Sequence, residues 1–248
     1  MPQLYEFRDR SGYVIQQEVL ALGHTAVVPP WFDSNIHIHT TAYEYYILWQ
    51  GELHFLVDGQ ALKLHAPEIL VVKPQVPHAI VGGVGPVEHF GLRVPGIHDK
   101  QVVADLPSVL SPFECEEERL LQADWGYRIP LADPAHQNWW VLGVHEAIFH
   151  SPLLAMAYLN FATAEESFVH ADRNQLHYHR ASWEYYLALR GSITLQVEDN
   201  QMVLNAGEIL SVPPGVKHCV IGRTVPYQGL TLRTPVQGDK VLVVPMSN

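Results

Sequence analysis

Two stretches of the chain decide the fold, HIHTTAYEYYILWQG at residues 37–51 and HYHRASWEYYLALRG at residues 177–191. Each places a His-x-His pair, a glutamate five residues later and a glycine seven residues after that. The second stretch begins 140 residues after the first, and the same offset joins His78 to His218. Between residues 37–80 and 177–220, 16 of 44 positions are identical without any insertion or deletion. This internal repeat predicts two homologous domains.

The composition fits a globular chain of this kind. The 248 residues are 48% hydrophobic and 17% charged, which is enough apolar material for two small cores. A formal net charge of −11 argues against general nucleic-acid binding. No apolar run reaches the length of a membrane span, and the first residues lack the apolar segment of a secretory signal. Two cysteines make no disulfide framework, so we expect a cytoplasmic protein.

Alternating apolar residues predict short strands in both repeats. Ile193, Leu195 and Val197 share one face of a strand, and Leu53, Phe55 and Val57 do so in the first repeat. A turn at Gln50-Gly51 is expected to join that strand to EYYILW as a hairpin. The fold class we predict from these strands is all-β, with each repeat forming a barrel or a double-sheet sandwich.

The segment between the repeats predicts a short helical linker. Ser111, Pro112 and Glu114 suit the first turn of a helix, and PLADPAHQN from Pro130 is typical of a loop. We therefore predict an N-terminal domain over residues 1–110, a linker over 111–135 and a C-terminal domain over 136–248.

The spacing of the histidines points to a metal. His37 and His39 face the same way in a strand, but Glu44 lies an odd number of residues further on. It can join them only if the chain turns within TTAY. His78 follows a proline-containing loop and completes the set. Surface or core histidines would explain one His-x-His pair, but not a four-membered set written twice. The predicted ligands are His37, His39, Glu44 and His78, and then His177, His179, Glu184 and His218.

Imidazole and carboxylate ligands suit a divalent transition metal, one in each domain. Iron or manganese is favoured, and zinc, nickel and cobalt also accept such ligands. Four protein ligands would leave two adjacent positions of an octahedral site open.

These residues resemble the motifs of the cupin superfamily, G-x5-H-x-H-x3-4-E-x6-G followed by G-x5-P-x-G-x2-H. The second repeat carries the second motif in full, at Gly207, Pro213, Gly215 and His218. The first repeat keeps only the histidine of this motif, His78. Pro67, Lys73 and Gln75 stand where the motif has Gly, Pro and Gly. Trp31 and Ala171 replace the opening glycine of the first motif. The resemblance covers about 70 residues of each half and implies a bicupin, a chain of two tandem, metal-binding, antiparallel β-barrels of the jelly-roll kind.

Several further residues are candidates for the pocket. If Glu44 faces the barrel interior, so does Tyr46, which is expected to lie opposite Phe55; Tyr186 is the equivalent in the second repeat. Such a tyrosine could contact a substrate or simply pack in the core. Arg93 and Arg233 could bind a substrate carboxylate, although an ion pair within the protein is the plainer interpretation.

Two other features receive plainer interpretations. The repeated pairs Asp99-Lys100 and Asp239-Lys240 suggest a solvated turn or a contact between domains. Strand parity places His54 on the outward face, which removes it from the catalytic candidates.

The sequence leaves several functions open. A metal-dependent enzyme acting on a small organic substrate is favoured, with aromatic and keto/enol compounds as candidates and an oxygenase slightly ahead. The alternatives are a non-redox isomerase, cyclase or decarboxylase, and a non-catalytic cupin that binds a small, sugar-like molecule. Catalytic residues cannot be assigned. The expected partner is a small molecule rather than nucleic acid or membrane, and a homodimer stays open.

Overall fold

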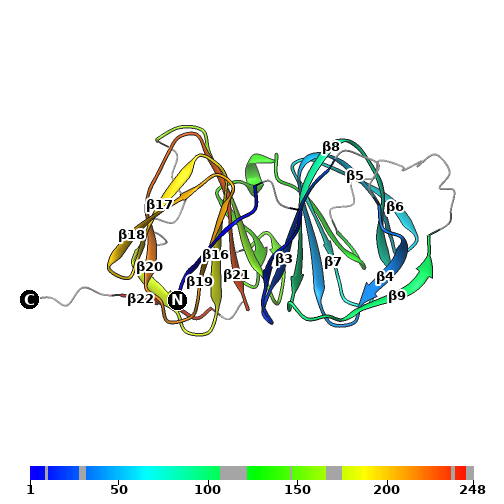
Figure 1. Ribbon diagram of the computed structural model, residues 1–248, viewed down its shortest axis with the longest axis horizontal. Helices are drawn as coiled ribbons and strands as arrows, with labels where there is room; N and C mark the ends of the chain where they lie inside the picture. The colour runs from blue at the N-terminus through cyan, green and yellow to red at the C-terminus, as the bar shows by residue number, and fades with distance from the viewer. Residues whose placement is uncertain are drawn as a thin grey trace, which may run out of the picture. The chain divides into compact units, whose positions relative to one another are not determined.

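The computed structural model describes residues 1–8, 11–27, 32–106, 122–145, 147–165, 175–235 and 238–243 (Figure 1). Almost all regular structure there is antiparallel β, as predicted, with one 3-10 turn, η1, at Pro134–His136. No helix able to span a membrane occurs in these ranges. The predicted linker helix near Ser111 lies outside the described residues. The chain divides into two compact units, residues 9–132 and residues 133–248 together with 1–8.

The unit of residues 9–132 is a barrel built on two long strands. Its main sheet has the order β10-β11-β7-β5-β8-β3-β2; β6 pairs with β5, and β4 pairs with both β8 and β9. The strands are β2 (Gly12–Gln16), β3 (Ala21–Val27), β4 (Asn35–His39), β5 (Tyr43–Val57), β6 (Gln60–His65), β7 (Glu68–Val72), β8 (His78–Val94), β9 (Lys100–Asp105), β10 (Gln122–Ala123) and β11 (Gly126–Pro130).

The other unit repeats this plan with two separate sheets. Their orders are β1-β19-β16-β21-β14-β12-β13 and β18-β17-β20-β15-β22. The strands are β1 (Gln3–Glu6), β12 (Trp139–Gly143), β13 (Phe149–His150), β14 (Ala155–Phe161), β15 (His177–His179), β16 (Trp183–Arg190), β17 (Ser192–Val197), β18 (Asn200–Asn205), β19 (Glu208–Val212), β20 (His218–Arg223), β21 (Tyr227–Thr234) and β22 (Lys240–Leu242).

The predicted hairpin at Gln50-Gly51 is wrong. β5 continues through Gly51, because β8 pairs with it on both sides, from Glu44 opposite Arg93 to Val57 opposite His78. Gly51 bends the strand instead of reversing it. Its φ is 83°, and an added Cβ would lie 2.4 Å from the carbonyl oxygen of Pro86, so only glycine fits this bend.

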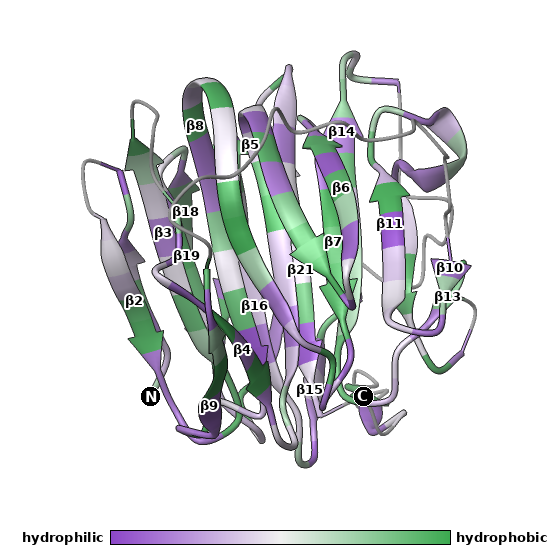
Figure 2. Ribbon diagram, turned by 90° about the vertical axis from the view of Figure 1, so that its right-hand side faces the viewer, coloured by the Kyte–Doolittle hydropathy of each residue, from purple (hydrophilic) through white to green (hydrophobic). Residues whose placement is uncertain are grey.

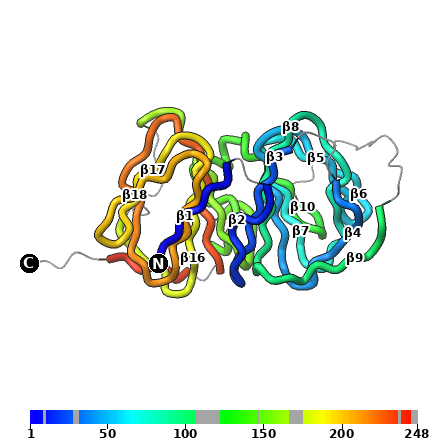
Figure 3. Tube along the Cα trace, in the orientation of Figure 1, coloured from blue at the N-terminus to red at the C-terminus, as the bar shows by residue number. Residues whose placement is uncertain are grey.

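A strand from the chain's N-terminus completes the sheet of the C-terminal repeat. β1 pairs antiparallel with β19, from Gln3 opposite Ser211 to Glu6 opposite Glu208. In Figures 1 and 3 this blue segment lies among the yellow and orange strands of that unit. In the other unit β11 pairs in the same way with β7. The strand that precedes each repeat in sequence therefore belongs to the other repeat's sheet.

The core of each barrel follows the period-two alternation of the strands. Hydrophilic and hydrophobic bands alternate along β5 and β8 (Figure 2). In the first barrel the predicted inward residues of β5 are buried with Tyr46 and Leu48 in one apolar cluster, to which Trp125 also belongs. The metal-motif residues lie where this inward face meets the ends of β4 and β8.

Candidate metal centres

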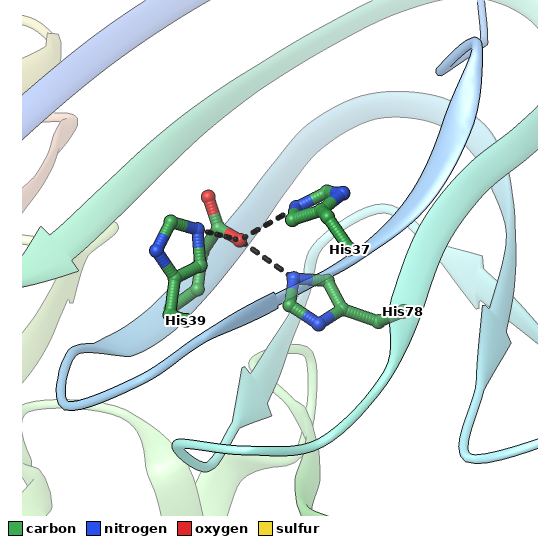
Figure 4. Close-up of side chains that lie close together, drawn as sticks. His37, His39 and His78 are labelled. Atoms are coloured by element: carbon green, nitrogen blue, oxygen red, sulfur yellow. Dashed lines mark hydrogen bonds and ion pairs between the residues drawn. The ribbon is translucent and has the colours of Figure 1, made fainter. Parts of the chain in front are cut away.

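The three predicted histidines of the first repeat converge on one carboxylate oxygen of the predicted glutamate (Figure 4). The Nε2 atoms of His37, His39 and His78 lie 3.6, 3.3 and 2.7 Å from Glu44 Oε2. The donor atoms of this group all lie within 4.8 Å of one another, and the three histidines are buried. This donor set can hold a single metal ion.

Local structure explains why these side chains meet. His37 and His39 lie two residues apart on β4 and face the same way, and His78 pairs with His37 at the start of β8. The chain turns between β4 and β5, as the odd spacing of Glu44 required. The loop before His78 keeps its geometry without the motif glycine, because Gln75 adopts a φ of 68° and donates its N–H to the His39 carbonyl at 2.7 Å.

The second centre reproduces the first. The Nε2 atoms of His177, His179 and His218 lie 3.5, 3.2 and 2.6 Å from Glu184 Oε2. The glycine of its loop, Gly215, has a φ of 82° and donates to the His179 carbonyl at 2.7 Å, which matches Gln75. All eight predicted ligands are therefore assembled in two groups of the same layout.

The electrostatics of both groups favour a charged carboxylate. Burial by itself raises the pKa of Glu44, but hydrogen bonds from the three imidazoles outweigh it and hold that pKa well below its ordinary value. Burial also raises the pKa of Glu184, but the charge interaction with His179, followed by hydrogen bonds from the three imidazoles, outweighs it and holds that pKa well below its ordinary value.

Burial lowers the pKa of His37 and of His177. Burial acts in the same way on His39 and His218, but the hydrogen bond to the glutamate and its charge outweigh it and raise their pKa, so a metal must displace protons there. Ionised glutamate and neutral histidine are the forms that bind a metal.

Two aspartates that the sequence analysis set aside belong to the centres. Asp99 Oδ1 lies 2.7 Å from His39 Nδ1, and its Oδ2 accepts the N–H groups of Thr41 and Ala42, both at 2.8 Å. Asp239 repeats this arrangement on His179. The solvated-turn interpretation is therefore wrong for both. Each aspartate orients the second histidine of the pair and closes the turn that brings the glutamate inward.

Replacing Asp99 by alanine is expected to weaken metal binding at the first centre by about 10- to 100-fold, because His39 loses the acceptor that holds its ring. Asp239→Ala should do the same at the second centre only. Competition with a chelator of known affinity would measure both. The matched control is Lys100→Ala, which alters the exposed neighbour of Asp99. An affinity in Asp99→Ala within twofold of the control would refute the orienting role.

The pocket candidates surround the two centres to different degrees. The Tyr46 hydroxyl donates to Glu44 Oε2 at 3.0 Å, and its ring packs on Phe55 with centroids 4.9 Å apart. The expected cross-strand pairing of these two residues is wrong, because both lie on β5 and Tyr46 pairs with Leu70 and Gly91.

Tyr186 lies equivalently, its ring centroid 6.0 Å from that of His218. Burial and the adjacent Glu44 raise the pKa of Tyr46 well above its ordinary value, so its hydroxyl stays protonated. His54 lies beside Glu52 at 2.5 Å, away from the centre, as strand parity predicted.

Arg93 and Arg233 lie directly opposite the two glutamates on the neighbouring strands. Arg93 donates to the Tyr13 hydroxyl at 2.7 Å, with its guanidinium carbon 5.4 Å from the centre of that ring. The guanidinium carbon of Arg233 lies 5.0 Å from the ring centre of Trp140. The buried Nε of Arg233 has no hydrogen-bond partner among the described residues. Within those residues neither arginine pairs with a carboxylate, so the ion-pair interpretation gains no support.

His89 is a buried polar residue that the sequence analysis missed. It lies opposite Leu48, with its ring centroid 6.4 Å from that of Tyr46. Burial, helped by nearby His24, lowers its pKa to about 4. Gly229 stands at the equivalent place in the second barrel, where an added Cβ would lie 2.2 Å from the Tyr227 hydroxyl. The candidate ligands were found as residues that recur 140 positions later. His89 was missed because a glycine, Gly229, stands at that position in the second repeat.

The burial of His89 predicts a loss of stability in acid. The unfolded imidazole takes up a proton near pH 6.5 and the folded one near pH 4, so stability present above pH 6.5 is lost as the pH falls between these values. The loss should approach about 3 kcal/mol. Urea unfolding of metal-free protein at pH 7 and pH 4.5 would measure it, and His89→Asn should lose correspondingly less. Parallel pH profiles for the two proteins would contradict this account.

The comparisons with known proteins agree with this architecture. Residues 167–225, in the second repeat, match the family model described as "Cupin domain". Residues 167–225 therefore carry a cupin domain, and the first repeat is similar to it in strand plan and donor set. No curated protein sequence matches this chain significantly.

Two enzymes of known structure have a similar fold at low sequence identity. A point mutant of Bacillus subtilis oxalate decarboxylase has a TM-score of 0.62 and 12% identity, covering 97% of this chain and 79% of that one. Salicylate 1,2-dioxygenase from Pseudaminobacter salicylatoxidans has a TM-score of 0.62 and 10% identity, covering 95% and 84%. A study of the Mn(II) centres of the B. subtilis decarboxylase gave a structure with a TM-score of 0.60 and 12% identity, covering 97% and 79%. At these identities the likeness shows the fold alone.

Proposed function

We propose that this protein is a bicupin and a metal-dependent enzyme acting on a small organic molecule. The observation that carries the proposal is the double set of three histidine Nε2 atoms gathered around an ionised glutamate. We assign His37, His39, Glu44 and His78 to one metal and His177, His179, Glu184 and His218 to the other. Iron or manganese suits these ligands, and the Mn(II) centres of the decarboxylase neighbour favour manganese. The cytoplasm is our proposed compartment.

A divalent metal with open positions would supply Lewis acidity and a place for a second small ligand. The remaining chemistry falls to the chain's own residues. The Tyr46 hydroxyl stays protonated and orients the Glu44 carboxylate through its hydrogen bond to Oε2. Arg93 and Arg233, each without a carboxylate partner in the described ranges, could hold the carboxylate of a substrate. These features support a small carboxylic acid as substrate, and the names of both structural neighbours are consistent with that class.

An oxygenase is slightly favoured over non-redox chemistry. The two reaction classes can be distinguished because only an oxygenase requires dioxygen. Protein purified without added metal would first be analysed for metal identity and amount. It would then be offered a panel of small carboxylic acids, with oxalate and salicylate first, while oxygen uptake and carbon dioxide release are followed. Oxygen uptake that depends on the substrate is the expected result. Equal turnover without oxygen would replace the oxygenase by an isomerase or decarboxylase, and retention of a ligand without turnover would leave a binding cupin.

Tyr46→Phe tests the role of the Tyr46 hydroxyl. This group donates to the carboxylate of Glu44 but is not one of the proposed metal ligands. The variant keeps the ring packed on Phe55 and should keep its metal, but turnover should fall by about 10- to 100-fold, because Glu44 loses the hydrogen bond that orients it. Tyr186→Phe is the matched variant of the second centre. Metal content and turnover would be measured together. Unchanged turnover in both variants would remove the tyrosines from the mechanism.

A further inference from the structure

The two centres share one layout but differ in the support of their histidines. In the second centre every ring has an acceptor at Nδ1: the Gln175 carbonyl for His177 at 2.8 Å, Asp239 for His179 at 3.1 Å and the Val216 carbonyl for His218 at 2.9 Å. In the first centre Asp99 serves His39 at 2.7 Å, and the Val76 carbonyl serves His78 at 2.8 Å. The Nδ1 atom of His37 is buried and has no hydrogen-bond partner in the part of the chain that the structure describes.

The lengths of the neighbouring strands account for the missing acceptor. β4 begins at Asn35, which pairs with Asp105 of β9 and is therefore held in the ladder. β15 begins only at His177, so Gln175 precedes the strand and its carbonyl can turn to the ring. The side-chain oxygen of Asn35 is itself buried without a partner among the described residues and does not replace that carbonyl.

The first centre is also the more open of the two. The Glu44 side chain is 14% exposed, whereas that of Glu184 is 5% exposed. Water and small competing ligands therefore have more access to the first carboxylate. The greater exposure of Glu44 and the missing acceptor at His37 both weaken metal binding at the first centre.

The missing acceptor bears directly on metal binding. A histidine that coordinates through Nε2 carries its hydrogen on Nδ1, and an acceptor for that hydrogen fixes both the tautomer and the ring. At His37 this hydrogen would be buried and unpaired, as far as the described residues go, whenever the ring coordinates. Loss of one such support typically lowers metal affinity by about 10- to 100-fold.

We propose that the two centres are unequal metal sites. The C-terminal centre holds a divalent metal about 10- to 100-fold more tightly, and the N-terminal centre exchanges its metal first. This inference rests on the metal assignment of the proposed function but not on any catalytic activity. It makes the N-terminal centre the one whose occupancy follows the supply of metal around the protein.

Two single-centre variants of the full-length chain test the proposal. His179→Ala leaves the N-terminal centre and His39→Ala leaves the C-terminal one. Each would be titrated with Co(II), whose visible absorption reports coordination, against a chelator of known affinity. The Co(II) dissociation constant should be about 10- to 100-fold larger for His179→Ala. Equal constants, or the reverse order, would overturn the inference and leave the metal assignment intact. No Co(II) binding by either folded variant would overturn both.

The wild-type protein provides a second measurement that needs no substitution. With both centres loaded with Co(II), a chelator should remove one equivalent well before the other. Proton NMR should show six shifted imidazole N–H signals, of which one exchanges with D2O much faster than the rest. The fast signal should survive in His179→Ala and vanish in His39→Ala. Single-phase release together with six equally slow signals would overturn the proposal, even where a variant fails to fold.

Discussion

His39→Ala is expected to remove one metal equivalent per chain, and His179→Ala to remove the other. Each histidine supplies one of three Nε2 atoms around a single carboxylate oxygen, 3.3 Å away in the first centre and 3.2 Å away in the second. Without it two histidines and the glutamate remain, which hold a metal more weakly, so that a chelator removes it. Elemental analysis after dialysis against a weak chelator should fall from two metal ions per chain to one in either variant, and to none in the double variant.

His54→Ala is the matched control for this experiment. It removes a histidine of the same domain that pairs with Glu52 rather than with the centre, and it should keep both metal ions. Circular dichroism would verify that each variant retains its strands. Unchanged metal content in either ligand variant would refute the assignment of that centre.

Deleting residues 1–7 is expected to destabilise the C-terminal unit and to spare residues 9–132. The deletion removes four paired residues from the edge of β19 together with Phe7, which is 4% exposed and donates its N–H to the Gly207 carbonyl at 2.9 Å. Loss of a buried phenylalanine alone costs about 3 kcal/mol or more. Hydrogen exchange followed by mass spectrometry should show faster exchange in residues 183–212 and little change in residues 43–72.

The control deletion removes only residues 1 and 2, which precede the first paired residue of β1. It should leave exchange in both segments unchanged. Faster exchange in residues 43–72 after the longer deletion, with residues 183–212 unaffected, would contradict the assignment of β1 to the C-terminal sheet.

Strand parity and the exact repeat made the centres predictable. Period-two alternation placed His37 and His39 on one face, and the odd step to Glu44 required a turn within TTAY, where the structure ends β4 and begins β5. The constant offset then transferred every argument to the second half. Parity also identified Tyr46 as a neighbour of the centre and placed His54 outside it.

Contacts distant in sequence were beyond the same reasoning. Asp99 lies 60 residues from His39, and nothing local in an Asp-Lys pair shows that its carboxylate returns to an imidazole. The hairpin at Gly51 was a plausible local interpretation, but the partner strand β8 runs past the bend and keeps β5 continuous. The pairing of β1 with β19 joins residues some two hundred positions apart, and no alternation pattern names its partner strand.

The placement of β1 gives the chain two covalent tethers between its units. Residues 1–8 and 133–248 form one unit and residues 9–132 form the other, so the backbone passes between them after residue 8 and again after residue 132. A protease that cuts after residue 132 leaves fragments 1–132 and 133–248, which are still held together by the pairing of β1 with β19. They separate only when that four-residue strand dissociates, and the C-terminal fragment would then expose the bare edge of β19 to any strand able to pair with it. The pairing of β1 thus lets the two copies stay associated after a single break between the repeats.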